Sequence, residues 1–296
     1  MIVSFLKPLL IIEMRFMDSL KNLQPVVMTI AGSDSGAGAG IQADIKTCAA
    51  LGVYCTTVLT AITAQNTQRI TACEPVSVQM LAQQFDAVTE DFNVAVIKIG
   101  MVGSVDNLHY LVARLSDYKR KNSNVFIVLD TPLRASVGFS LLDVNNADLL
   151  WKLIRLVDLV TPNLMEAAFL LECAEARSTQ MMALQTLQFV ERGAKAVLLK
   201  GGHLVGDQAA DCLLSTDTGA APVWFSNTKI STRNNHGTGC TLASAIAAQL
   251  VLGYPVPEAI SRAKQYLHTL LQQSQQRHYG LGSGPLECLN LSRSII

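Results

Sequence analysis

The sequence predicts an α/β protein in which a mostly parallel central sheet carries helices on both faces. Short apolar runs rich in β-branched residues alternate with helix-length amphipathic segments along nearly the whole chain, and this pattern is typical of parallel strands joined by helical crossovers. Half of the 296 residues are apolar and only 16% are charged, so the chain can bury a substantial core. No Pro-, Ser- or charge-rich linker divides it, which favours a single domain.

The elements follow one another in a regular order. The apolar run at 26–31 predicts the first strand, and the glycine-rich loop after it opens a helix over 40–51. A run of β-branched residues predicts the next strand at 53–63. Further apolar runs predict strands at 94–99, 125–129, 158–161, 195–199 and 211–215. The intervening amphipathic segments predict helices over 77–91, 106–121, 147–156, 163–171, 179–192, 241–252 and 256–273.

Composition and charge exclude several classes of function. Lys plus Arg and Asp plus Glu both number 23, so no bulk field attracts nucleic acid or a membrane surface. The seven cysteines show no Cys-x-x-Cys spacing, which predicts reduced thiols in a cytoplasmic protein. The apolar run at 1–12 falls short of the roughly 20 residues that span a bilayer, so we expect no membrane anchor. Residues 1–24 are an N-terminal extension, explained equally well by an overextended start codon and by a dispensable arm.

Polar and glycine residues follow the ends of several predicted strands. In parallel sheets, ligands bind beyond the carboxyl ends of the strands, so these residues predict one ligand-facing rim. The set comprises the loop from Gly32 to Gly40, the pair Gly100-Met101, Asp130, the run from Thr161 to Asn163, and the run from Lys200 to His203.

The run His236-Gly237-Thr238-Gly239-Cys240 is followed by a helix of small residues. The glycines allow close approach of the backbone to a ligand, and the helix directs its unpaired amides and its positive dipole end at the same point. Since thiol pKa values fall at such positions, we expect the pKa of Cys240 to be lowered. The run predicts catalysis on a charged, phosphorylated species.

Three further residues fit a nucleotide site. Asp130 and Glu166 could hold Mg²⁺ through water beside a triphosphate, because hard cations prefer carboxylate and water oxygens. Lys200 follows an apolar strand and could neutralise phosphate charge. Glu166 also stands three residues after Asn163, so a capping box is an alternative interpretation of that pair.

Two familiar phosphate-binding motifs are absent. Gly36-x-Gly38-x-Gly40 does not match Gly-x-Gly-x-x-Gly, and no acidic residue follows at the distance a dinucleotide-binding unit requires. The run from Gly40 to Thr47 lacks the glycine before the lysine of a P-loop. Two interpretations of the glycine-rich loop remain open. It is either a flexible loop that opens a helix, or a binding loop for a small substrate with Asp44 on the first turns of the helix.

Seven stretches of the chain occur together and in this order in one known family. They are Thr29–Asp34, Gly38–Asp44, Thr60–Thr67, Lys98–Met101, Thr161–Asn163, Leu199–His203 and His236–Thr241. With them the chain resembles the hydroxymethylpyrimidine/phosphomethylpyrimidine kinases of thiamine biosynthesis, within the ribokinase-like superfamily. The terminal Cys240 of Gly-Thr-Gly-Cys and Gln65 within Ala-Gln-Asn-Thr distinguish this family from sugar kinases, which end the first motif in Asp. The resemblance spans 25–285, the predicted kinase domain, with 286–296 as a C-terminal tail.

The resemblance implies a ribokinase-like three-layer sandwich and two successive transfers of the ATP γ-phosphoryl group. The first transfer goes to the hydroxymethyl group of 4-amino-5-hydroxymethyl-2-methylpyrimidine, and the second to the monophosphate. Cys240 would be the base, and the amides from Gly237 through Gly239 to Cys240 would form the anion hole. The other implied roles are pyrimidine binding by Gln65, Gly32, Ala39, Asp44 and Met101, ATP binding by Lys200, Asn163 and Thr238, Mg²⁺ binding by Asp130 and Glu166, and a homodimeric assembly.

One departure from the family pattern affects the phosphate half of the site. Ser136 stands where members of the family commonly have a lysine, which puts nucleotide affinity or rate in doubt. Alternative functions are a pyridoxal-type kinase, a non-catalytic pyrimidine-binding sensor, and a cysteine hydrolase with Cys240 as nucleophile and His236 as base.

Overall fold

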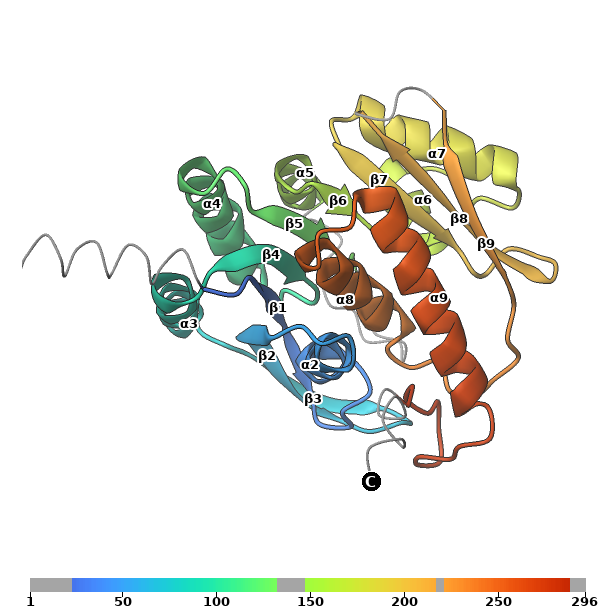
Figure 1. Cartoon of the computed structure of the whole chain (residues 1–296), viewed down its shortest axis with the longest axis horizontal. Helices are drawn as coiled ribbons and strands as arrows, with labels where there is room; N and C mark the ends of the chain where they lie inside the picture. Colours follow the sequence, from blue (N-terminus) through green and yellow to red (C-terminus); the bar gives the residue numbers. More distant parts are fainter. Residues whose placement is uncertain (1–22, 132–146, 217–220, 288–296) are drawn as a thin grey trace, which may run out of the picture.

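The computed structural model of the chain describes residues 23–131, 147–216 and 221–287, and in these residues nine strands form one sheet (Figure 1). Along the sheet the strands are β3 (Ile70–Pro75), β2 (Cys55–Gln65), β1 (Val26–Asp34), β4 (Val94–Ile99), β5 (Phe126–Leu129), β6 (Leu159–Val160), β7 (Ala196–Gly201), β8 (Gln208–Ser215) and β9 (Val223–Thr228). From β2 to β7 in this order, neighbouring strands are parallel. The pairs β2–β3, β7–β8 and β8–β9 are antiparallel.

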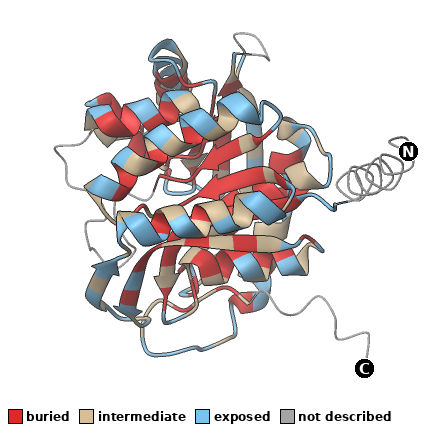
Figure 2. Ribbon diagram, turned by 90° about the vertical axis from the view of Figure 1, so that its left-hand side faces the viewer, coloured by how far each residue is buried: buried red, intermediate tan, exposed pale blue. Residues whose placement is uncertain are grey.

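Helices cover both faces of the sheet, so the predicted three-layer α/β architecture is confirmed. One face carries α2 (Gly40–Ala50), α8 (Thr238–Val251) and α9 (Val256–Ser274). The other carries α3 (Val78–Asp91), α4 (Val105–Lys121), α5 (Ala147–Leu156), α6 (Leu164–Leu171) and α7 (Thr179–Glu191). Each face has its own apolar cluster, and buried residues lie on the helices as well as on the strands (Figure 2).

Small residues bring helix α8 close to the sheet. Ala243, Ala245 and Ala247 are completely buried, in the same cluster as Val27 and Val96 of the central strands. Short side chains let the helix axis approach the strands, and this close approach positions the helix N-terminus at the carboxyl edge of the sheet.

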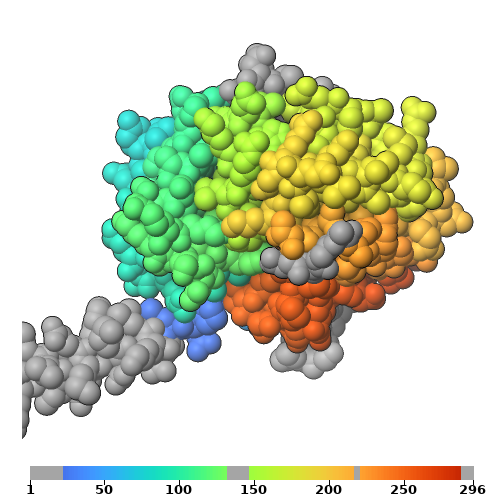
Figure 3. All heavy atoms as spheres, turned by 90° about the horizontal axis from the view of Figure 1, so that it is seen from above, coloured from blue at the N-terminus to red at the C-terminus, as the bar shows by residue number. Residues whose placement is uncertain are grey.

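All the predicted strands and helices are present with ends shifted by a few residues, but two strands were missed. β3 and β9 lie at the two edges of the sheet, and α8 begins at Thr238 instead of 241. Seen from above, the first half of the chain covers one side of the molecule and the second half covers the other (Figure 3). No helix in the part of the chain that the structure describes could cross a bilayer. The N-terminal extension lies almost entirely outside the described residues.

Candidate active site

Two helix N-termini meet at the carboxyl edge of the sheet. Gly237 precedes α8 with φ at 83°, and a Cβ there would lie 1.9 Å from the carbonyl oxygen of Gly38. Only glycine fits this position, because the backbone is left-handed and the two loops touch. Neither α8 nor α2, which starts at Gly40, has a side-chain cap. Uncapped amides and two positive dipole ends therefore converge, as an anion site requires.

Cys240 lies in the first turn of α8 and is partly exposed. Burial raises the pKa of its thiol to about 11, and the ammonium of Lys98 opposes this only in part, while Asp44 and Asp130 add to it. The expected lowering of the pKa of Cys240 was therefore wrong, because loss of hydration outweighs the helix dipole. In the free protein at neutral pH, the thiol carries its proton.

The side chain of Asp44 is enclosed by neighbouring side chains and does not face an open pocket. The side chains of Asp44 and Lys98 are both 0% exposed, and Lys98 Nζ donates to both carboxylate oxygens at 2.9 Å. The hydroxyls of Thr29 and Ser244 donate to the same carboxylate at 2.5 and 2.6 Å. Ser244 follows Cys240 by one helical turn, so the two share a helix face. The predicted direct contact of Asp44 with the pyrimidine does not fit this geometry, since internal donors occupy both oxygens.

Lys200 and Asp130 form an ion pair beside the turn. Lys200 Nζ lies 2.8 Å from Asp130 Oδ1, which also accepts from the hydroxyl of Thr161 at 3.0 Å. A Cβ on Gly239 would lie 3.3 Å from Asp130 Oδ2 and 3.5 Å from Lys200 Nζ. Burial opposes the charged form of both residues. Their mutual attraction nevertheless lowers the pKa of Asp130 and raises the pKa of Lys200 relative to the usual values. Both charges are thus permanent at neutral pH and border the anion site.

Glu166 closes the capping box of α6. Its Oε2 accepts from the backbone amide of Asn163 at 2.8 Å and from Thr131 Oγ1 at 3.1 Å, while Asn163 Oδ1 accepts from the Glu166 amide at 2.9 Å. Burial raises the pKa of Glu166 to about 7, and Lys200 offsets this only in part. Within the described ranges, no group of three or more His, Cys, Asp or Glu side chains could hold a metal on its own. The two carboxylates nevertheless suit a water-mediated cation, because an incompletely neutralised buried carboxyl gains from added positive charge.

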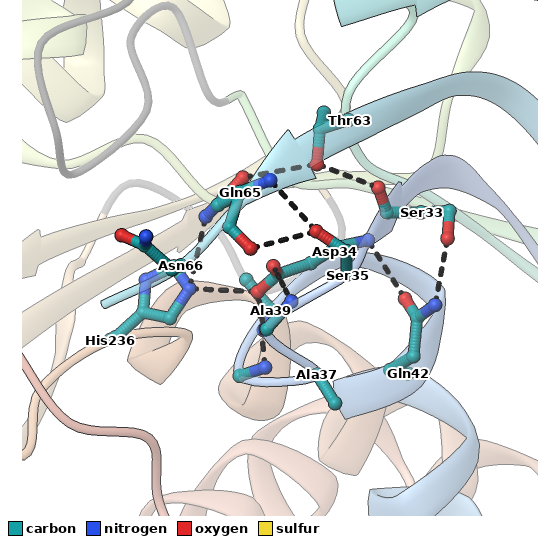
Figure 4. A network of polar contacts seen from close by, with 12 residues as sticks. Ser33, Asp34, Ser35, Ala37, Ala39, Gln42, Thr63, Gln65, Asn66 and His236 are labelled. Atoms are coloured by element: carbon teal, nitrogen blue, oxygen red, sulfur yellow. Dashed lines mark hydrogen bonds and ion pairs between the residues drawn. The ribbon is translucent and has the colours of Figure 1, made fainter. Parts of the chain in front are cut away.

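Gln65 lies at the end of β2 within a polar network (Figure 4). Its Nε2 is 3.2 Å from His236 Nε2, and its Oε1 is 3.3 Å from Thr63 Oγ1. His236 Nε2 also lies 2.8 Å from Asp34 Oδ2. The residue immediately before the anion-binding turn thus contacts the predicted pyrimidine-binding amide.

The remaining pocket residues gather around the loop after β1. A Cβ on Gly32 would lie 2.2 Å from Met101 Cε, so these two predicted residues are neighbours. The amide of Ala39 donates to Asp34 Oδ2 at 2.9 Å. The structure thus brings Gly32, Met101 and Ala39 to the same end of the sheet as Gln65.

Two site residues, Asp34 and Lys98, received no role from the sequence, and His236 was named only as the base of the alternative hydrolase. Each of the three lies in one of the stretches that match the family, so the sequence marked its position. A motif does not show which side chains contact one another in the folded protein. Ser136, whose identity put nucleotide binding in doubt, lies outside the described residues.

A family model described as phosphomethylpyrimidine kinase matches residues 34–287. The chain belongs to this family. Among its relatives, a hydroxymethylpyrimidine/phosphomethylpyrimidine kinase of Rhizobium meliloti is 44% identical over 88% of the chain and 96% of the relative. A thiamine biosynthesis bifunctional protein of Geobacter sulfurreducens is 42% identical, and the match covers 88% of the chain and 51% of that protein.

Solved structures show the same fold. A phosphomethylpyrimidine kinase from Clostridium difficile is 37% identical with a TM-score of 0.70, covering 83% of this chain and 98% of the other. The pyridoxal kinase of Staphylococcus aureus, solved with AMP-PCP and pyridoxal, is 28% identical with a TM-score of 0.78 over 92% and 96% of the two chains. The ribokinase-like fold and a phosphotransferase activity, as expected from the sequence, are confirmed.

Proposed function

We propose that this protein phosphorylates 4-amino-5-hydroxymethyl-2-methylpyrimidine with ATP, and then phosphorylates the monophosphate to the diphosphate, in thiamine biosynthesis. The observation that carries this proposal is the contact between His236 and Gln65. It joins the anion-binding turn, which starts at Gly237, to the amide that would bind the pyrimidine ring. A substrate whose ring lies at Gln65 can then present its hydroxymethyl group to a phosphoryl group held by the turn.

In the transfer, the hydroxymethyl oxygen forms a bond to the γ-phosphorus as the bond to the β–γ bridging oxygen breaks and ADP departs. Positioning and charge stabilisation do most of this work in phosphoryl transfer. The amides of 237–240 would stabilise the transferring oxygens, and Lys200 would offset phosphate charge. Asn163 and Thr238 would contact the nucleotide.

We assign the acceptor of the hydroxyl proton to Cys240. Because burial raises the pKa of its thiol to about 11, the thiol must first release its own proton to water, and the resulting thiolate then takes the hydroxyl proton. Cys240 is thus a modest base. Stabilisation of the phosphoryl group by the amides of 237–240 and by Lys200 would contribute more to the rate acceleration. A cysteine hydrolase is less well supported, since it needs a ready thiolate and since His236 Nε2 is committed to Asp34.

Asp130 and Glu166 would hold Mg²⁺ through water. When bound, the ion would supply positive charge that offsets the charge of the phosphates. Both carboxylates border Lys200, so cation and ammonium would act on the same triphosphate. Relatives solved with ADP and AMP-PCP support nucleotide binding at this fold.

The first experiment measures Mg-ATP-dependent ADP release with the hydroxymethylpyrimidine, its monophosphate and pyridoxal in parallel. We expect turnover of both pyrimidines. Turnover of pyridoxal alone would favour the pyridoxal-type kinase, a candidate supported by the solved pyridoxal kinases. Pyrimidine binding without ADP release would instead identify a non-catalytic sensor that binds the pyrimidine but no longer transfers phosphate.

We also propose that the protein is a cytoplasmic homodimer. Similarity to the kinase family supports the dimer. For the cytoplasmic location, the support is that the cysteines among the described residues are free thiols. Sedimentation equilibrium of the purified chain should give twice the 31.9 kDa monomer mass. A monomer mass at micromolar concentration would refute the dimer.

A further inference from the structure

The carboxylate of Asp34 is held as a charged acceptor. Its Oδ1 accepts from the amide of Gly36 at 2.8 Å, and its Oδ2 accepts from the amides of Gly38 and Ala39 at 3.0 and 2.9 Å. Burial alone would raise the pKa of Asp34, but His236 and these amides hold it below its usual value. An ionised carboxylate has no proton to donate.

This fixes the proton on the histidine. His236 is 6% exposed, and its Nε2 lies 2.8 Å from Asp34 Oδ2. Since Asp34 can only accept, Nε2 must carry a hydrogen and donate it. The same nitrogen therefore has no lone pair to offer to Gln65.

The contact between His236 Nε2 and Gln65 Nε2, at 3.2 Å, would then set two donors against each other. A second conflict lies at the other end of the amide. Thr63 Oγ1 donates to the carbonyl oxygen of Ser33 at 2.9 Å, so its one proton is unavailable to Gln65 Oε1 at 3.3 Å. Turning the amide of Gln65 by half a turn resolves both conflicts at once, because nitrogen and oxygen of a glutamine are distinguished by their partners. The oxygen then shares the single Nε2–H of His236 with Asp34 in a bifurcated hydrogen bond, and the nitrogen donates to the lone pair of Thr63 Oγ1.

We infer that His236 and Asp34 are positioning residues that fix the polarity of the Gln65 amide, with its oxygen on the His236 side and its nitrogen on the Thr63 side. This inference rests on the proposed function, in which Gln65 binds the pyrimidine. Gln65 is half-buried, and in this polarity one N–H and one oxygen lone pair of its amide remain for a ligand.

The fixed polarity selects the substrate. A 4-aminopyrimidine offers a ring-nitrogen acceptor beside an amino donor, which pairs with the N–H and the oxygen of Gln65. The 4-oxo analogue offers the reverse, a ring N–H beside a carbonyl oxygen, and would place donor against donor and acceptor against acceptor. A site built for one hydrogen-bond pattern rejects its inverse because buried polar groups are left unpaired. His236 and Asp34 thus make the site specific for the amino form.

The test compares kcat/KM for the 4-amino alcohol and its 4-oxo analogue. We expect the wild-type protein to prefer the amino form by about 10² or more. His236→Leu frees the amide to rotate, so the preference should fall at least tenfold, the effect of about 1.4 kcal/mol of hydrogen bonding. His236→Gln keeps an N–H donor toward Asp34 and Gln65 and should restore the preference. An unchanged preference in folded His236→Leu overturns the inference.

Two controls separate positioning from stability. His268 makes a similar 3.2 Å contact with Gln272 on α9, so His268→Leu should leave the preference unchanged. If His236→Leu does not fold, Asp34→Asn replaces it. Its amide can donate to the histidine and turn Nε2 into an acceptor, so the preference for the amino form should again fall. A constant preference in this variant overturns the inference as well.

Failure of the proposed function can be recognised separately. A wild-type protein that phosphorylates neither pyrimidine refutes the kinase assignment. Calorimetric binding of the two pyrimidines to wild-type and His236→Leu protein then still measures the preference. Loss of that preference in the variant supports the inference, and its persistence overturns it.

Discussion

At the scale of single residues, the decisive feature is a thiol that burial keeps protonated. Below its pKa of about 11, the thiolate fraction of Cys240 grows about tenfold for each unit of pH. If Cys240 accepts the substrate proton, single-turnover rates should rise between pH 6 and 8. Cys240→Ala should lower the rate by about 10², flatten this rise, and leave pyrimidine affinity unchanged. Cys173→Ala, which removes an exposed thiol, is the control. Wild-type turnover in Cys240→Ala would exclude the base assignment.

Removing one partner of the buried pair of Lys98 and Asp44 should lower stability more than removing one partner of an exposed ion pair. Lys98→Met leaves the Asp44 carboxylate without its cation beneath the anion-binding turn, which should cost about 3–5 kcal/mol of unfolding free energy. Arg120 and Asp117 form an exposed pair with 74% and 62% of the side chains accessible, so Arg120→Met should change little. Urea unfolding measures both variants. Equal midpoints for the two would contradict this role.

The sequence predicted which residues would lie close together, but not the burial and protonation of each. Asp130 and Lys200 were expected together because both follow parallel strands, and they lie 2.8 Å apart. The environment of Asp44 was missed because its partner, Lys98, lies on another element and the burial of a lysine leaves no trace in a motif. The pKa of Cys240 was missed for a similar reason, since hydration depends on packing from several elements.

At the scale of elements, the start of α8 depends on one glycine. Gly237→Ala would place a Cβ 1.9 Å from the carbonyl oxygen of Gly38 in a left-handed backbone, so we expect loss of turnover and of several degrees in Tm. Gly253 has φ at 89° but open space around it. Gly253→Ala should therefore cost only about 1–2 kcal/mol of backbone strain, with normal turnover. Similar turnover in the two variants would show that the contact between the loops is dispensable.

The elements missed by the sequence are the edge strands. In β3 no residue is fully buried, and in β9 half-buried and exposed residues alternate. Continuous apolar runs mark strands that are covered on both faces, so the interior of the sheet was predictable and its edges were not. The early start of α8 was missed because Gly239 is a poor helix former.

At the scale of the whole molecule, ligand binding should stabilise the sheet as one unit. The site draws on β1, β2, β5, β7 and α8, which span most of the nine-stranded sheet. A nucleotide present at about 100 times its Kd stabilises the folded state by about 2.7 kcal/mol, which is a shift of about 4–5 °C in Tm for a domain of this size. Calorimetry with Mg²⁺ and AMP-PCP should show one transition that moves as a whole. Lys200→Ala, which removes the ammonium beside Asp130, should reduce the shift. Two transitions, with only one of them moved by the nucleotide, would mean that the predicted kinase domain over 25–285 consists of separate folding units.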